Sequence, residues 1–209
     1  MKNKTKTTVA KKRATTLSKP TLEKMLAATY DKSNVNLDSY QVDAGLSDAR
    51  VKVYHDPLTN HTVVAHRGSA EARDWYENVK YGLGIESGAG WKHSKEIQKL
   101  AEQKYGTANL TTIGHSKGAL HAQKFGKHGD IVTLNKPVAI KDLFYKVPEY
   151  QTDYTGRGDV VSALRPFQRG KKRVVLGKRG SAALRVLKKG LLPTILTEHA
   201  TSTLRRKNN

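Results

Sequence analysis

The stretch TTIGHSKGALHA, residues 111–122, constrains the fold of this chain more than any other. It begins with β-branched and apolar residues, passes through a serine framed by glycines, and continues with helix-forming residues. Gly114, Ser116 and Gly118 form the pattern G-x-S-x-G, in which a strand turns sharply into a helix and small neighbours let the backbones approach. Ser116 is therefore either a nucleophile presented by the turn or a cap of the following helix.

The segments on both sides of this turn predict an α/β fold with a mainly parallel sheet flanked by helices. Two β-rich runs separated by the turn-forming DPLTN predict a hairpin. Strands and helices then alternate along the chain, as a parallel sheet requires. The expected elements lie at 51–55, 62–66, 94–105, 108–113, 116–126 and 129–135. Gly106 is the predicted C-cap of the 94–105 helix.

The folded domain is predicted to span residues 21–204, between a basic flexible tail over 1–20 and a basic end over 205–209. A first helix is expected after Pro20, with Thr21 as its N-cap. Its apolar face is formed by Leu22, Met25, Leu26 and Tyr30. The glycine-rich stretch 81–93 is predicted to be a mobile loop.

The net charge of +20 is carried almost entirely by two flanks. Residues 1–22 contribute +7 and residues 165–209 contribute +12, so the segment between them is close to neutral. Basic flanks attract polyanions, which include nucleic acid, anionic lipid surfaces and acidic protein. The charge pattern alone does not choose among these partners.

The residue types that are missing also limit the chemistry. The chain has no cysteine, which excludes disulfides, thiolate zinc sites and a cysteine nucleophile. No His, Asp and Glu cluster has the spacing of metal ligands, so we expect no metal and no cofactor. The first twenty residues lack the apolar stretch of a secretory signal, and nowhere do about 18 apolar residues run together. We therefore expect a soluble, intracellular protein.

A nucleophilic serine needs a general base and an acid that orients it, which follow an elbow serine in the order acid, then histidine. His121 and His128 lie on or just beyond the elbow helix, which leaves His199. Asp159 lies in TGRGDVVSAL, where glycines precede it and an apolar run follows, as at the end of a strand. Asp153 is the second choice, and Asp159 could instead close a local turn.

Four separated segments, covering roughly residues 50–204, resemble class 3 (fungal-type) lipases. VVAHRGSAEARDW resembles the family's strand that ends in Arg-Gly-Thr or Arg-Gly-Ser before Asp-Trp, and GHSKGA resembles its GHSLGG elbow. GDVVSAL resembles the acid segment and EHATSTL the terminal histidine segment. Taken singly, 66–69 could be a strand entering a turn and Asp74-Trp75 an ordinary helix start.

The resemblance implies an α/β-hydrolase fold and a serine ester hydrolase of the lipase or phospholipase type, which cleaves acyl esters through an acyl-enzyme. It implies Ser116 as the nucleophile, His199 as the general base and Asp159 as the residue that orients the imidazole. It also implies an oxyanion hole formed by the backbone N–H groups of Ser69 and Lys117.

Three positions depart from the family pattern. His66 stands in place of Phe, Lys117 in place of Leu, and Ala119 in place of the second glycine of the elbow. The first two changes put polar or charged groups near the site, which argues against a pocket for neutral triglyceride.

Two further segments have open interpretations. NVKYGLGIESGAGWK occupies the position of the family's lid, where Leu83, Ile85 and Trp91 could contact an acyl chain, or it forms a surface loop. The run around 184–191 predicts a short basic amphipathic helix, which either packs on the sheet or docks on an anionic membrane. Docking would favour a phospholipid ester as the substrate.

The alternative function is a non-catalytic basic protein that uses a lipase-like fold and binds nucleic acid through its flanks. A third hypothesis joins the two, as a small viral or mobile-element lipase that is associated with a virus particle. The expected partners are a lipid or phospholipid ester, an anionic membrane surface and nucleic acid.

Overall fold

A mixed β-sheet organises the computed structural model, which describes residues 16–31, 33–69, 89–138, 146–157, 159, 173–176, 200 and 204–205. The described residues form one seven-stranded sheet with its strands in chain order. The strands are β1 (Gln41–Val42), β2 (Val51–Asp56), β3 (His61–His66), β4 (Leu110–His115), β5 (Asp130–Leu134), β6 (Gln151–Gly156) and β7 (Arg173–Leu176). The helices are α1 (Lys19–Ala28), α3 (Ala89–Tyr105) and α4 (Lys117–Phe125).

Strand direction divides the sheet into two parts. β1, β2 and β3 pair antiparallel, whereas β3 to β7 pair parallel. The predicted hairpin and the predicted, mainly parallel sheet are therefore confirmed. Because parallel strands point the same way, β3, β4, β5 and β6 all end at one edge of the sheet, which we call the carboxyl edge.

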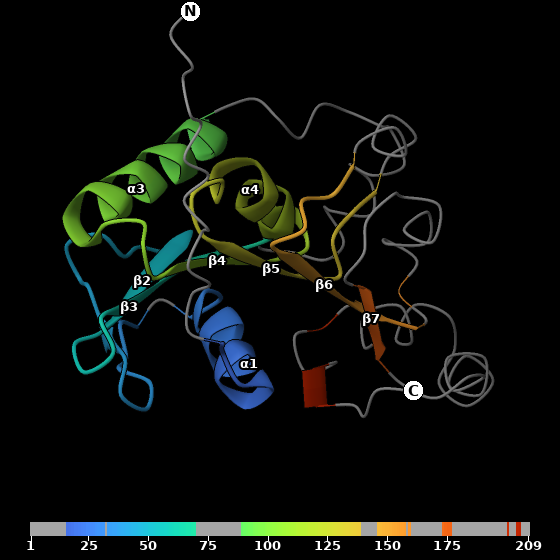
Figure 1. The fold of residues 1–209 in the computed structure, drawn as a ribbon, viewed down its shortest axis with the longest axis horizontal. Coiled ribbons are helices and arrows are strands. Elements are labelled where there is room, and N and C mark those ends of the chain that lie inside the picture. Colours follow the sequence, from blue (N-terminus) through green and yellow to red (C-terminus); the bar gives the residue numbers. More distant parts are fainter. Residues whose placement is uncertain are drawn as a thin grey trace, which may run out of the picture.

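Helices cover both faces of the sheet, with α3 and α4 on one face and α1 on the other (Figure 1). Side chains alternate between the faces along β3, since Val63 and Ala65 join the α1 core while Val64 packs against α3. The two cores explain why every residue of β3 and β4 is buried.

The helix ends differ from the predicted ones in two places. α1 is capped by Ser18, whose Oγ accepts the Thr21 N–H at 3.2 Å, so the prediction of Thr21 as the cap is wrong. α3 begins at Ala89, so the predicted loop is wrong over 89–93. The end of α3 is as predicted, since Gly106 has φ +78° and donates its N–H to the Glu102 carbonyl at 2.9 Å.

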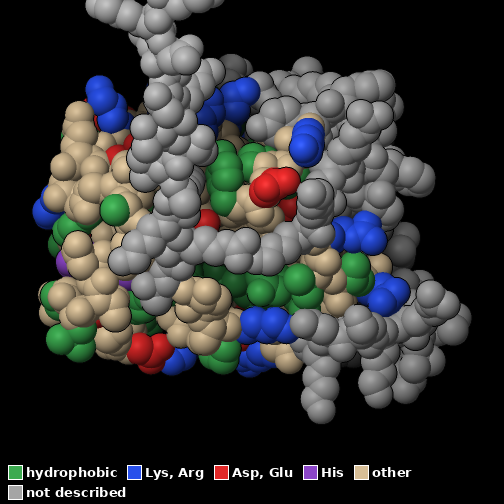
Figure 2. All heavy atoms as spheres, viewed as in Figure 1, with side chains coloured by type: hydrophobic (Ala, Val, Ile, Leu, Met, Phe, Trp, Pro, Cys, Tyr) green, Lys and Arg blue, Asp and Glu red, His purple; other side chains and the backbone are tan. Residues whose placement is uncertain are grey.

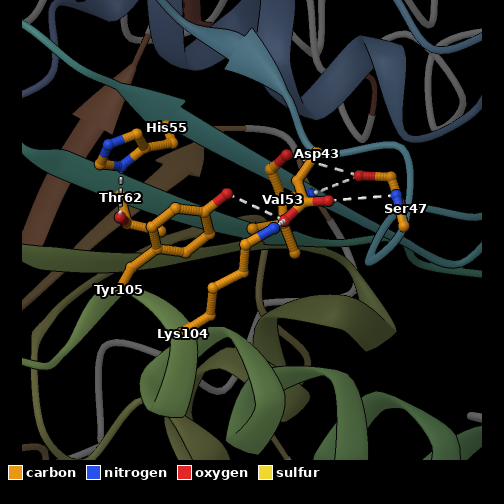
Figure 3. A network of polar contacts seen from close by, with 8 residues as sticks. Asp43, Ser47, Val53, His55, Thr62, Lys104 and Tyr105 are labelled. Atoms are coloured by element: carbon orange, nitrogen blue, oxygen red, sulfur yellow. Dashed lines mark hydrogen bonds and ion pairs between the residues drawn. The ribbon is translucent and has the colours of Figure 1, made fainter.

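The end of α3 is tied to the loop after β1 by a polar network (Figure 3). The Asp43 carboxylate accepts hydrogen bonds from Lys104 Nζ at 2.7 Å and Tyr105 Oη at 2.9 Å. The Tyr105 ring stacks on His55, with centroids 4.4 Å apart. Burial disfavours the charged form, but the bonds from Lys104 and Tyr105 hold the pKa of Asp43 below its ordinary value.

Several predictions lie outside the described residues. They include the Asp74-Trp75 segment, residues 78–88 of the lid predicted over 78–92, and the amphipathic helix around 184–191. The last residues of the predicted lid, 89–92 with Trp91, lie in α3. Within the described ranges, no helix has the length and apolar character needed to cross a bilayer.

Candidate active site

Ser116 occupies the turn between β4 and α4 in a backbone conformation that L-residues rarely adopt. Its φ is 56° and its ψ is −126°, and the residue is 3 % exposed. Its N–H donates to the Leu134 carbonyl of β5 at 3.0 Å, which fixes the turn against the next strand. The Ser116 side chain makes no capping hydrogen bond to α4, so the helix-cap interpretation is wrong.

The two glycines of G-x-S-x-G are required by close backbone contacts. A Cβ on Gly114 would stand 2.2 Å from the Gly118 carbonyl oxygen, and a Cβ on Gly118 would stand 2.1 Å from the His66 carbonyl oxygen. The start of α4 thus packs directly on the ends of β4 and β3. Any side chain at either position would push these elements apart.

Residues 66–69 run beside Ser116, as the resemblance implied for the oxyanion loop. A Cβ on Gly68 would lie 2.8 Å from the Ser116 Cβ and 2.9 Å from the His115 carbonyl oxygen. Ser69 follows Gly68 and is half-buried. Lys117 opens α4, so its N–H belongs to the first turn, where amides have no partner within the helix. The structure therefore brings both predicted donor segments to the serine.

Tyr30 lies just beyond the end of α1 and forms hydrogen bonds to the 66–69 loop and to β4. The sequence analysis placed this residue only on an apolar helix face. Its Oη accepts the Gly68 N–H at 3.2 Å and lies 2.6 Å from His115 Nδ1. The residue as a whole is 37 % exposed, but its hydroxyl lies between these two groups. Burial raises the pKa of Tyr30 to about 12, against the opposing effects of the Gly68 N–H and Arg67.

The two candidate acids lie at different levels of the sheet. Asp153 lies inside β6 beside Thr133, and its carboxylate accepts Gln151 Nε2 at 2.7 Å and the Thr133 hydroxyl. Asp159 follows the end of β6, where its N–H donates to the Gly156 carbonyl at 3.0 Å, and it is 5 % exposed. Asp159 therefore lies at the carboxyl edge, as Ser116 does. His199 lies outside the described residues, so its contact with Asp159 stays a prediction.

An aromatic cluster of two buried histidines and two half-buried rings packs between α3 and α4. Its members are His66, Trp91, His121 and Phe125. His66 Nε2 donates to Gln98 Oε1 at 3.2 Å. Among the described residues, His66 Nδ1 and both ring nitrogens of His121 have no hydrogen-bond partner. Burial lowers the pKa of His66 to about 4. Burial, then His66, Lys117 and Arg50, lower the pKa of His121 to about 3.

The opposite edge of the sheet carries a separate hollow of about 220 Å³. Thr111, Asp130 and Thr152 line it, at or near the amino ends of β4, β5 and β6. Figure 2 shows apolar and acidic side chains meeting near the middle of one face of the molecule, with Lys and Arg at its margins. Because Ser116 follows the carboxyl end of β4, this hollow is not part of the candidate active site.

Within the described part of the chain, no three His, Asp or Glu side chains are grouped as metal ligands.

Solved structures of fungal lipases share this fold. Lip2 lipase from Yarrowia lipolytica matches with a TM-score of 0.51 and 15 % identity, over 75 % of this chain and 78 % of that one. A fungal lipase in complex with an inhibitor matches with a TM-score of 0.53 and 14 % identity, over 78 % and 80 %. No protein-family model and no curated protein sequence matches the chain. At these identities the likeness shows the fold alone, which is the α/β-hydrolase fold of lipases.

Proposed function

We propose that this protein is a serine ester hydrolase that cleaves acyl esters of lipids. The observation that carries the proposal is the conformation of Ser116, which has a positive φ and no capping bond at a strand-to-helix turn. A strained non-glycine residue persists only where its surroundings hold it in place, and such residues concentrate at functional sites. The lipase structures that share the fold supply the substrate class.

The proposed chemistry proceeds in two balanced steps. Ser116 Oγ attacks the ester carbonyl carbon while His199 takes its proton, and that proton then goes to the alcohol as it leaves. Water attacks the acyl-enzyme, gives a proton to His199 and releases the acid, and the proton returns to Ser116. Asp159 orients the imidazole, and the N–H groups of Ser69 and Lys117 stabilise the negative oxygen of each tetrahedral intermediate.

The basic flanks are proposed to add a polyanion partner, either an anionic membrane or nucleic acid. Most of the +20 net charge lies in residues 1–22 and 165–209, the second of which includes β7. Electrostatic binding to a polyanion weakens as salt is added. Binding of the full chain to DNA and to anionic vesicles should therefore fall steeply between low and moderate salt, and salt-insensitive binding would remove this proposal.

Hydrolysis of a soluble ester tests the proposed activity. Wild-type protein should hydrolyse p-nitrophenyl butyrate, and Ser116→Ala and Asp159→Asn should lose at least about a hundredfold in kcat/KM. Ser94→Ala is the matched control, since Ser94 is also buried but lies within α3. Equal rates for wild type and Ser116→Ala, with both proteins folded, would exclude Ser116 as the nucleophile.

A further inference from the structure

Three basic residues lie on main-chain segments that neighbour the candidate nucleophile, Ser116. Lys117 directly follows Ser116, and Arg67 directly precedes Gly68, the residue in contact with Ser116. Arg67 donates its N–H to the Arg50 carbonyl at 2.9 Å, which joins the residue before β2 to the end of β3. Basic residues from three separate segments therefore neighbour the turn that holds Ser116.

These three side chains have no carboxylate partner among the described residues. Elsewhere in the described ranges, Lys24, Lys104 and Arg205 each pair with a carboxylate at 2.7 to 3.0 Å. Asp48, two residues before Arg50, already accepts the N–H groups of Arg50 and Val51 and pairs with His93. The positive charge beside Ser116 is therefore not neutralised within the described protein.

Contacts and electrostatic effects place the side chains of Arg50 and Lys117 around one region. The Arg50 guanidinium packs on Gly90, where a Cβ would lie 2.7 Å from Nη1, and the next residue, Trp91, contacts His121. Lys117 lies one helical turn before His121 on α4, and both Lys117 and Arg50 act on that imidazole. The N-terminus of a helix carries partial positive charge from the helix dipole. Neither α3 nor α4 has an acidic residue in its first turn, so no carboxylate there offsets this charge.

We infer that Arg50 and Lys117 form a subsite for an anionic phosphate group carried by the lipid ester that Ser116 cleaves. A guanidinium binds phosphate oxygens in a bidentate manner, and an ammonium adds a mobile point charge. The exposed Arg50 and the half-buried Lys117 can meet a charged head group at the protein surface while the ester lies at Ser116. This inference rests on the proposed hydrolase function and names its substrate class as anionic phospholipids.

The test uses short-chain phosphatidylglycerol and phosphatidylcholine as monomers, below the concentration at which either forms micelles, so that no lipid surface is present. The wild type should prefer the anionic ester, and Arg50→Gln should lower the ratio of the two kcat/KM values about fivefold. Lys99→Gln removes an exposed charge from the middle of α3 and should leave the ratio unchanged. An unchanged ratio in Arg50→Gln overturns the inference. A loss seen only on vesicles also overturns it, because the charge then serves surface docking.

Binding to Ser116→Ala separates this inference from the proposed function. Calorimetric titration of Ser116→Ala with monomeric phosphatidylglycerol should show binding. The affinity should be about fivefold weaker in the double variant that also carries Arg50→Gln. If the protein hydrolyses p-nitrophenyl butyrate but shows no preference for phosphatidylglycerol over phosphatidylcholine, the proposed hydrolase function stands and the anionic subsite is rejected. Arg50-dependent binding without hydrolysis of any ester would retain the subsite and reject the hydrolase.

Discussion

Gly68 packs so closely on Ser116 that a β-carbon at residue 68 would stand 2.8 Å from the serine Cβ. This contact joins two segments that the sequence separates by almost fifty residues. It places the end of β3 beside the turn after β4, so the proposed oxyanion-hole donors and the proposed nucleophile share one edge of the sheet.

Gly68→Ala should disturb this edge. The added methyl group would collide with Tyr30 Oη, Ser116 Cβ and the His115 carbonyl, and such overpacking costs about 1 to 3 kcal/mol. We expect slower reaction with a fluorophosphonate and a lower denaturant midpoint. Gly45→Ala is the control, because its Cβ would meet nothing closer than 3.4 Å. A Gly68→Ala protein that reacts at the wild-type rate would contradict the assigned contact.

Tyr30→Phe removes the hydroxyl that joins Gly68 to His115. The Gly68 N–H then loses its partner and the loop is less well positioned, so kcat/KM should fall on the order of tenfold to a hundredfold. Tyr54→Phe removes another buried hydroxyl far from the turn and should leave the rate unchanged. If both variants lose activity equally, Tyr30 is not a positioning residue.

Acid should destabilise the protein through its buried histidines. The lowered pKa values of His61, His66 and His121, about 4, 4 and 3, mean that the unfolded chain binds more protons below pH 6.5. Their contribution is therefore complete above pH 6.5 and is lost as the pH falls toward the folded values, by about 1.4 kcal/mol per pH unit for each histidine. Urea unfolding between pH 7 and 4.5 measures this slope.

His121→Phe should flatten that slope, since it removes one buried imidazole and preserves a ring against Trp91 and Phe125. His128 is exposed and pairs with Glu102, so His128→Gln should retain the wild-type slope. A wild-type slope in His121→Phe would show that this imidazole is not buried as a neutral group.

Asp43→Asn should weaken the attachment of α3 without affecting the active site. The variant loses the charge that accepts bonds from Lys104 and Tyr105, and such a charged hydrogen bond contributes about 1.5 to 3 kcal/mol (Figure 3). The lowered pKa of Asp43 means that this stability is present above the unfolded pKa and is lost as the pH falls through the folded one. Denaturant unfolding at pH 7 checks the cost. Asp38→Asn, which breaks an exposed pair with Lys24, should cost less than about 1 kcal/mol.

The sequence predicted the parts of the fold that local patterns encode. β-branched runs and glycines placed β2, β3, β4, β5 and α4, and the glycine-framed serine marked the turn that the structure contains. The four-residue β7 was missed because RVVL lies in a strongly basic run, and β1 has only two residues. The start of α3 was missed because Gly90 was interpreted as a loop residue. In the structure, Gly90 lies in α3 and packs against the Arg50 guanidinium.

Long-range contacts at the site could not be read from spacing. Tyr30 and His115 are 85 residues apart, and no local pattern links a helix-end tyrosine to the strand before the elbow. The different positions of Asp153 and Asp159 in the sheet likewise needed the register of β6, because both acids follow the serine in the required order. Only the sheet shows that Asp153 is engaged inside the layer by Thr133 and Gln151.

The most direct test of the central claim is to locate the site of fluorophosphonate attack on the full chain by peptide mass spectrometry. We predict one adduct, on Ser116, with loss of ester hydrolysis in proportion to labelling and no labelling of Ser116→Ala. Anionic vesicles are included so that a closed site has the surface it would need to open. A folded protein that remains unlabelled under these conditions, or is labelled equally in Ser116→Ala, would contradict the assignment of Ser116 as an activated nucleophile.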